Sequence, residues 1–220
     1  TKYSYTLINK TYTPSVEEIA IINDINIDIS YWGKKSKIYV DYKKNLKLAH
    51  YFGQVRRCAY CRTKLRTDAY WEDLDHIVAQ SVREKWVFIP KNLIVTCEPC
   101  NRLKNASSTL ADQMTNLFPN ASNGFNIFNP HFDNWNEHFE IFKGIFLRGI
   151  PGTKGPNTFE FCRLYRYDVI INNVEEQIIW GASTMKRLTH RLKNVEKDSR
   201  EFEQISKAIS HMIQRKKNNQ

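Results

Sequence analysis

The chain has 220 residues, enough for one sizeable domain with a hydrophobic core and extensions. Hydrophobic residues make up 41% of it and aromatic residues 13%, which excludes a disordered tail. The longest apolar runs, such as residues 19–22, are far too short to span a bilayer, and residues 1–12 lack the apolar core of a signal peptide, so we expect a soluble, cytoplasmic protein with no membrane contact.

The net charge of +10 is distributed unevenly along the chain. Residues 34–66 contain 11 lysines and arginines against one aspartate, and residues 181–220 contain 10 against four acidic residues. Basic residues interleaved with tyrosine and tryptophan suit a phosphate backbone, and a solvated basic surface is the equal alternative. The residues that we expect to bind nucleic acid, or else to be solvated, are Lys34, Lys35, Lys37, Lys43, Lys44, Arg56, Arg57 and Lys104.

The first 55 residues contain patterns of short helices. "SVEEIAIIND", residues 15–24, predicts a helix with Ser15 as its N-cap. "KIYV", residues 37–40, has the composition of a short strand, and residues 42–53 then follow a helical pattern that closes at Gly53.

The middle of the chain predicts a strand, a loop, a strand and a helix. Residues 56–67, "RRCAYCRTKLRT", form a cysteine knuckle, and the alternation in "AYWEDLDHIVA", residues 69–79, predicts a strand. A polar connection around residues 80–91 leads to a second strand in "NLIVTC", residues 92–97. "EPCNRLKNASS", residues 98–108, then begins a helix, because Glu and Pro suit its first turn.

The last part of the chain is dominated by a long amphipathic pattern. Residues 111–180 are rich in Asn, Phe and Gly and predict no clear element, whereas residues 182–214 predict one long helix. We expect its apolar stripe to be a packing face, with docking of a partner as the alternative. The stripe contains Met185, Leu188, Leu192, Val195, Phe202, Ile205, Ile209 and Met212.

Four of the five cysteines form two C-x-x-C pairs separated by 35 residues. Zn²⁺ prefers four thiolate or imidazole ligands in a closed tetrahedral site, and two such knuckles supply them. Redox chemistry is the rival use of C-x-x-C, and the odd number of cysteines fits poorly with a secreted disulfide framework. We therefore expect a structural zinc ion on Cys58, Cys61, Cys97 and Cys100, with Cys162 as a small buried residue.

Polar residues of a second kind lie between the two cysteine pairs. Asp75 offers a hard oxygen for Mg²⁺ or Mn²⁺, and the neutral imidazole of His76 can take a proton from water near pH 7. By itself, an Asp-His dipeptide is weak evidence for a catalytic metal site. It gains weight from Asn92 at the start of the second strand and Asn101 directly after the last cysteine.

Together, "CAYC", "LDHIVAQS", "NLIVTCEPCN" and "RLK" resemble the HNH (His-Asn-His) endonucleases. The resemblance implies an α+β fold, with a zinc-stapled ββα-metal core and mainly helical N- and C-terminal extensions. It implies that Asp75 and Asn101 bind one divalent cation, that His76 is the general base, and that Asn92 holds the loop that orients the base. The domains expected are an N-terminal basic and aromatic extension (1–55), the nuclease core (56–110), a downstream extension (111–180) and a C-terminal amphipathic helix (181–220).

The implied reaction is single-metal hydrolysis of a phosphodiester bond in nucleic acid. His76 would deprotonate a water in line with the scissile bond, and the Mg²⁺ or Mn²⁺ ion would neutralise charge on the phosphate and the leaving oxygen. Departure of the 3′-oxygen, as in the family, leaves 5′-phosphates. DNA is the favoured substrate, and RNA is the alternative.

A weaker resemblance covers residues 125–141 and 149–173. Both segments are similar to an extension found after the HNH core in bacterial proteins. Some of these proteins are nuclease subunits of antiphage defence systems, such as the Septu type and retron-associated modules, and work with an ATPase subunit. The same region has a second set of metal-ligating residue types, for which we expect structural packing: His131, Asp133, His138 and Glu140.

Two other functions compete with a nuclease. One is a non-catalytic zinc-dependent module that binds nucleic acid through residues 34–66, and the coincidence of Asp75, His76 and Asn101 argues against it. The other is an interaction subunit whose C-terminal helix docks a partner, which is compatible with cleavage. The sequence leaves the trigger, the sequence preference and the oligomeric state open.

Overall fold

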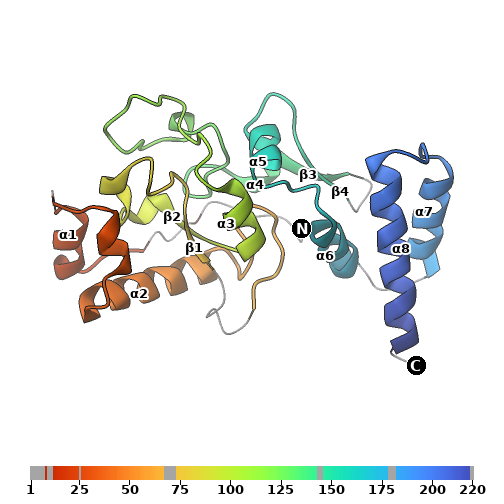
Figure 1. Ribbon diagram of the computed structural model, residues 1–220, viewed down its shortest axis with the longest axis horizontal. Helices are drawn as coiled ribbons and strands as arrows, with labels where there is room; N and C mark the ends of the chain where they lie inside the picture. The colour runs from red at the N-terminus through yellow and green to blue at the C-terminus, as the bar shows by residue number, and fades with distance from the viewer. Residues whose placement is uncertain are drawn as a thin grey trace. The chain divides into compact units, whose positions relative to one another are not determined.

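The computed structural model describes residue 8 and residues 12–24, 26–66, 73–142, 146–177 and 182–218. Over these ranges the fold is mixed α+β, with eight α-helices and two antiparallel two-stranded sheets (Figure 1). This confirms the fold class at the level of its elements. None of the described helices is long and apolar enough to cross a membrane.

The chain divides into two compact units. Thr1–Glu140 and Arg148–Leu164 form the first, and Ile141–Leu147 and Tyr165–Gln220 form the second. The first unit thus contains residues from three of the four domains expected from the sequence, namely 1–55, 56–110 and 111–180. Two hydrogen bonds show why: Trp135 Nε1 donates to the Tyr60 carbonyl at 3.1 Å, and His131 Nε2 lies 2.9 Å from the Leu93 carbonyl oxygen.

The first unit begins with the expected capped helix. In α1 (Val16–Ile22), the Ser15 hydroxyl accepts a bond from the Glu18 amide, and the Glu18 carboxylate accepts one from the Ser15 amide. This capping box satisfies two amides that a helix start leaves free. The 3₁₀ turn η1 (Ile29–Gly33) follows.

The strand expected over residues 37–40 is wrong, because these residues form the start of helix α2 (Lys37–Gly53). The spacing of four between Ile38, Tyr42 and Leu46 places all three on one side of the helix. Tyr42 and Leu46 are fully buried, in a cluster that includes Phe88, and Ile38 packs against that cluster. Burial of this stripe outweighs the β preference of Ile38 and Val40.

The strand, loop, strand and helix predicted for the middle of the chain are present. Strand β1 (Asp73–His76) pairs antiparallel with β2 (Leu93–Thr96), so that Asp75 faces Ile94 and His76 faces Leu93. Residues 69–72, the start of the expected strand, lie outside the described residues. The connection contains η2 (Glu84–Trp86) and η3 (Pro90–Asn92). Helix α3 (Glu98–Lys104) packs against β1, and α2 packs against β2 (Figure 1).

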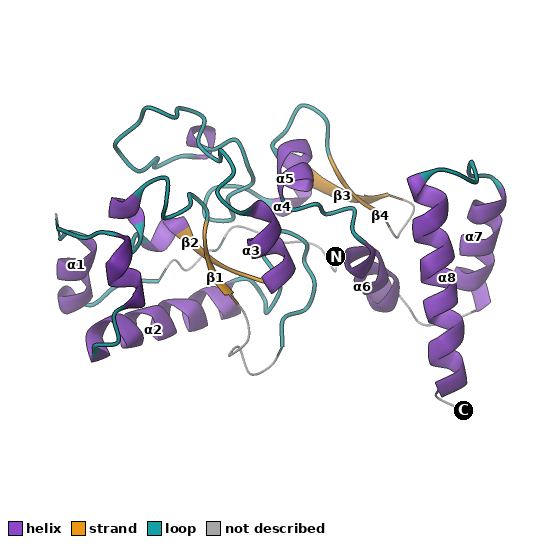
Figure 2. Ribbon diagram, in the orientation of Figure 1, coloured by secondary structure: helices purple, strands orange, loops and turns teal. Residues whose placement is uncertain are grey.

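Loops dominate the chain between α3 and residue 134 (Figure 2). The remaining elements are η4 (Ser122–Gly124), α4 (Trp135–His138), β3 (Phe139–Phe142), β4 (Phe146–Gly149) and α5 (Gly155–Phe161). A side chain at Gly155 would place its Cβ 1.8 Å from the His138 carbonyl oxygen. Only glycine therefore allows α5 to begin this close to α4.

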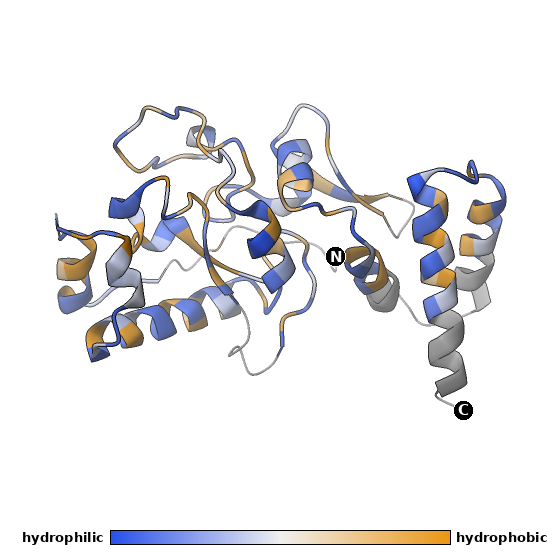
Figure 3. Ribbon diagram, in the orientation of Figure 1, coloured by the Kyte–Doolittle hydropathy of each residue, from blue (hydrophilic) through white to orange (hydrophobic). Residues whose placement is uncertain are grey.

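The second unit contains α6 (Tyr167–Gln177), α7 (Ala182–Lys193) and α8 (Arg200–Asn218). One continuous helix over 182–214 is wrong: the chain turns at residues 194–199, and the Ser199 hydroxyl caps α8 by accepting a bond from the Phe202 amide at 3.1 Å. The apolar stripe is a packing face as expected, because Leu188 and Ile205 are buried together with Ile170. Figure 3 shows apolar and polar bands alternating along α7 and α8. The side chains of Met185 and Met212 lie outside the described residues.

Candidate functional site

Four cysteines gather at one point of the first unit. The Sγ atoms of Cys58, Cys61, Cys97 and Cys100 all lie within 4.8 Å of one another. The Cys61 and Cys97 sulfurs are 3.7 Å apart, and a tetrahedral ion with Zn–S bonds of about 2.3 Å places its sulfurs about 3.8 Å apart. The four cysteines therefore could hold one zinc ion in a closed site.

Backbone hydrogen bonds shape both knuckles for this role. The Cys58 amide donates to the Thr63 carbonyl at 2.9 Å, and the Arg62 amide donates to the Cys58 carbonyl at 3.2 Å. Cys97 is the N-cap of α3, and the Cys100 amide donates to its carbonyl at 3.0 Å. The ends of two different segments thus bring two sulfurs each to one centre.

The thiols depend on a cation for their ionisation. Burial raises the pKa of Cys100 well above its usual value, and hydrogen bonds with neighbouring thiols, including that of the buried Cys162, add to the rise. Four thiolates this close repel one another without an ion. A zinc ion would supply the positive charge that removes this penalty, and its binding would then contribute folding free energy.

Asp75 carries a buried carboxylate on β1, with 3% of its side chain exposed. Its Oδ1 lies 3.2 Å from the Lys104 ammonium, which also donates to the His76 carbonyl at 2.8 Å. Its Oδ2 is buried and accepts no hydrogen bond from the described residues. Burial raises the pKa of Asp75 to about 6, although Lys104 opposes that rise. An unpaired buried carboxylate oxygen is costly, and a cation would satisfy it.

His76 is the last residue of β1 and is 8% exposed. Its Nε2 lies 3.0 Å from the Val87 carbonyl oxygen, and its ring packs against that of Trp32, with 4.4 Å between the ring centroids. Burial lowers the pKa of His76 to about 4, so the ring is neutral at pH 7. Because a carbonyl only accepts hydrogen bonds, the proton belongs on Nε2, and Nδ1 carries the lone pair that can accept a proton.

Asn92 closes the loop between the two strands. Its Oδ1 accepts a bond from the Val78 amide at 2.8 Å, and its Nδ2 donates to the Val78 and Trp86 carbonyls, both at 3.1 Å. The side chain is fully buried. Trp86 precedes Val87, so the same loop presents the carbonyl that holds His76. These contacts hold the loop between the two strands in one conformation.

Asn101 lies in the first turns of α3, and its Nδ2 donates to Asp73 Oδ2 at 2.9 Å. Asp73 is half-buried. The sequence reasoning missed this residue, although alternation along a strand places positions 73 and 75 on the same face.

The basic residues differ in their surroundings. Lys43 is half-buried and donates to the Trp32 carbonyl at 2.6 Å, and Arg57 Nη1 donates to the Arg62 carbonyl at 2.9 Å. Both therefore have structural contacts. The exposed members of the set are Lys34, Lys35, Lys37, Lys44 and Arg56.

Lys104 is the exception in this set. It is 1% exposed, and its ammonium is held between Asp75 and the His76 carbonyl. The expectation of a phosphate contact or a solvated side chain at Lys104 is therefore wrong. A sequence pattern cannot signal this, because the last turn of a helix is an ordinary place for an exposed lysine.

The second set of metal-ligating residue types is engaged in packing, as expected. Asp133 accepts bonds from Lys154 at 2.8 Å, His138 Nδ1 accepts one from the Lys154 amide at 3.3 Å, and Glu140 pairs with Arg148. His131 is buried beside His50, with 4.9 Å between their ring centroids. Burial lowers the pKa of His50 to about 3 and that of His131 to about 4, so both rings are neutral.

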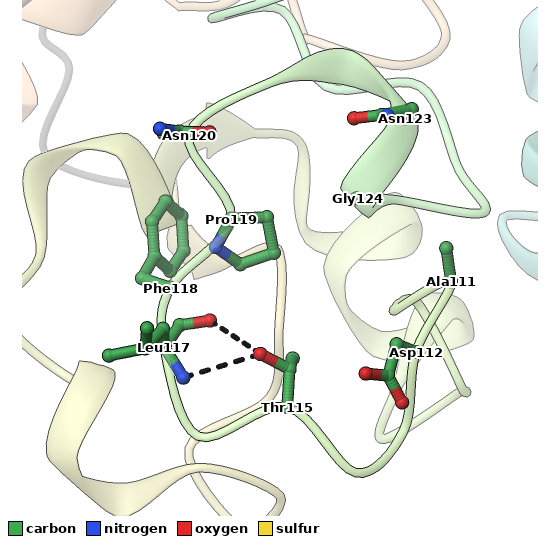
Figure 4. A pocket seen from close by; sticks show the side chains of 9 residues that line it. All are labelled: Ala111, Asp112, Thr115, Leu117, Phe118, Pro119, Asn120, Asn123 and Gly124. Atoms are coloured by element: carbon green, nitrogen blue, oxygen red, sulfur yellow. Dashed lines mark hydrogen bonds between the residues drawn. The ribbon is translucent and has the colours of Figure 1, made fainter.

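A pocket of about 360 Å³ lies in the loop between Ala111 and Gly124 (Figure 4). Thr115 shapes its rim by bonding both the amide and the carbonyl of Leu117. Arg83 attaches this loop to the β1–β2 connection by donating to the Thr115 carbonyl at 3.1 Å. The lining contains one carboxylate, Asp112, and no histidine or cysteine, so it does not repeat the chemistry of the residues around β1.

Comparisons with known proteins find no relative. No family model, curated protein or solved structure matches the chain. Its function must therefore be inferred from its own residues and their geometry.

Proposed function

We propose that the chain is a metal-dependent endonuclease of the HNH type that hydrolyses phosphodiester bonds in nucleic acid. One observation supports this most strongly: the buried, unpaired Oδ2 of Asp75 lies next in sequence to His76, at the end of strand β1. One oxygen of the Asp75 carboxylate lacks a hydrogen-bond donor, and one nitrogen of the neutral His76 imidazole lacks a proton. Such an oxygen can bind a cation and such a nitrogen can accept a proton from water, which are the two functions that a hydrolytic site needs.

The residues present fit a hard divalent cation such as Mg²⁺ or Mn²⁺. Asp75 Oδ2 would supply one oxygen and Asn101 Oδ1 another, and neither accepts a hydrogen bond from the described residues. Hard cations prefer such oxygen ligands and keep the rest of their shell as water and substrate phosphate. When bound, the ion would neutralise charge on the phosphate and on the departing oxygen.

His76 acts as the general base in this proposal. The bond from Nε2 to the Val87 carbonyl fixes the tautomer and the ring plane, which leaves Nδ1 to accept a proton from the attacking water. Burial lowers the pKa of His76 to about 4, which keeps the ring neutral, and a scissile phosphate beside it would raise that pKa towards the working pH. Asn92 maintains the loop that holds the Val87 carbonyl.

The segment before α2 is the proposed approach for the nucleic acid. Trp32 lies against His76, and Lys34 and Lys35 follow it with exposed side chains. The Lys34 ammonium lies 3.1 Å from the Tyr31 ring centroid. Lysines bind backbone phosphates, and aromatic rings such as the half-buried Tyr31 and Trp32 can stack on bases, so this arrangement supports a strand that reaches His76.

A catalytically silent zinc module that binds nucleic acid is the second candidate. The observation in its favour is that His76 is 8% exposed, beneath Trp32, while Lys104 already pairs with Asp75. If the chain cleaves nucleic acid, the resemblance suggests a wider role, as the nuclease subunit of an antiphage complex with an ATPase partner. Both candidate functions use the same zinc-stapled scaffold, and they differ only in whether the protein cleaves the nucleic acid that it binds.

Incubation with two substrates separates the candidates. The purified protein is mixed with plasmid DNA or with total RNA, with and without Mg²⁺ or Mn²⁺. The proposal expects cleavage that requires the divalent cation, with 5′-phosphate ends. Binding in gel-shift assays without cleavage of either nucleic acid, under all these conditions, would establish the silent module instead.

A further inference from the structure

Asp73 and Asn101 form a contact whose chemistry extends the proposed site. Side chains two apart on a strand point to the same face, so Asp73 and Asp75 lie on one face of β1. Helix α3 packs against that strand, and Asn101 lies on it directly after Cys100. The zinc-binding cysteines thus fix the helix start that carries the amide.

The hydrogen bond from Asn101 to Asp73 determines which way the amide faces. A carboxylate only accepts hydrogen bonds, so the NH₂ group of Asn101 must be the atom that meets Asp73 Oδ2 at 2.9 Å. The amide oxygen is then turned away from Asp73, and it accepts no hydrogen bond from the described residues. Hard cations bind an amide through its oxygen only.

A second observation points to a ligand at the same face. Asp75 Oδ2 is buried without a hydrogen-bond donor, two residues along the strand from Asp73. The Asp73 carboxylate also contributes negative potential there, since it acts to raise the pKa of Asp75. A cation near these oxygens would be attracted by both carboxylates.

We propose that Asp73 is a positioning residue that sets the orientation of the Asn101 amide, so that its oxygen is presented to the divalent cation. This inference rests on the proposed function, because it deepens the role of Asn101 in the same site. Asp73 acts through Asn101 and is not itself a ligand. Partners that orient metal ligands commonly change metal affinity by about 10–100-fold when replaced.

The variant Asp73→Asn tests this with little change in shape. Its amide can donate as well as accept, so it no longer excludes the flipped orientation of Asn101. We expect the affinity of the zinc-loaded chain for Mn²⁺, measured by calorimetry, to fall at least about tenfold. Zinc content and thermal unfolding should stay at the wild-type values. The matched control is Glu98→Gln, which removes an exposed carboxylate of α3 that pairs with Arg102.

A double-mutant cycle separates orientation from direct ligation. If Asp73 acts through Asn101, then Asp73→Asn lowers the affinity much more in the wild type than in Asn101→Ala, where only the loss of the Asp73 charge remains. An equal fall in both backgrounds would make Asp73 a ligand and overturn the inference, as would an unchanged affinity in Asp73→Asn. Failure of the proposed function looks different, because Asn101→Ala would then bind Mn²⁺ as the wild type does, or neither protein would bind it.

The orientation of the Asn101 amide can also be followed by NMR in the absence of Mg²⁺ or Mn²⁺. The side-chain NH₂ resonances of Asn101 are assigned by their absence from the spectrum of the ¹⁵N-labelled Asn101→Ala variant. We expect Asp73→Asn to shift them, whereas Glu98→Gln leaves them in place. Unshifted resonances in Asp73→Asn would mean that the contact does not hold the amide, and would overturn the inference even if that variant bound metal weakly.

Discussion

The replacement Lys104→Met removes the cation that pairs with the buried carboxylate of Asp75. In the wild type, the rise in the pKa of Asp75 from 3.8 to about 6 makes its ionisation within the fold about 3 kcal/mol harder than in the unfolded chain. Loss of Lys104 takes away the ion pair at 3.2 Å and the bond to the His76 carbonyl. Breaking a buried pair of this kind costs about 3–5 kcal/mol.

The loss of stability caused by Lys104→Met should depend on pH in a defined direction. Without Lys104 the pKa of Asp75 rises further, because Lys104 is the main group that lowers it. A carboxyl group whose pKa is raised by folding contributes stability below its unfolded pKa and loses it as the pH rises through the folded value. The destabilisation of Lys104→Met should therefore be largest at pH 8 and smaller at pH 5, where Asp75 is mostly protonated in both proteins.

Urea unfolding of the zinc-loaded protein, without added Mg²⁺ or Mn²⁺, measures this at both pH values. The control is the double variant Lys104→Met/Asp75→Asn, which removes both charges and should recover much of the stability at pH 8. A Lys104→Met protein as stable as the wild type at pH 8 would refute the reasoning. So would a loss that the double variant does not reduce.

Three further outcomes follow from the zinc cluster, the exposed lysines and the buried histidines. Elemental analysis should find about one zinc per chain, and Cys97→Ser should lose the ion and unfold; a folded, zinc-free wild type would contradict this. Replacing Lys34 and Lys35 with Gln should shallow the salt dependence of nucleic-acid binding by about one unit of slope per lost contact. The matched control replaces two exposed lysines of the second unit, Lys193 and Lys197. An unchanged salt dependence after replacement of Lys34 and Lys35 would show that this segment does not bind the nucleic acid. Because burial lowers the pKa of His50 to about 3, stability should fall as the pH drops below about 6.5. His50→Phe should flatten that fall in urea titrations, and an identical fall in both proteins would exclude this origin.

The residues that could be predicted from the sequence are those whose spacing reflects geometry directly. Two C-x-x-C pairs predicted a four-cysteine cluster because each pair turns its sulfurs to one side, and the cluster is present. The family resemblance singled out Asn92, which precedes a buried strand and whose amide bonds both the amide and the carbonyl of Val78. Such constraints are local, so a single sequence carries them.

What the sequence could not predict depends on contacts between distant segments. The β-branched residues near position 40 favoured a strand, but a core cluster around Phe88 selects a helix there. The turn before α8 is stabilised by packing of Leu188 against Ile205, which no helical periodicity can distinguish from one long helix. The burial of Lys104 likewise depends on Asp75, which lies on a separate element.

Cleavage by His76→Ala tests the central proposal most directly, because His76 is assigned to water activation and to neither metal site. The wild type and the variant are compared at equal zinc content, with Mg²⁺ or Mn²⁺, on whichever nucleic acid the wild type cleaves. We predict a loss of at least about 10²–10⁴-fold in rate, with the fold and zinc content intact. Undiminished cleavage by a folded His76→Ala protein would contradict the assignment of the base and of the site built around it.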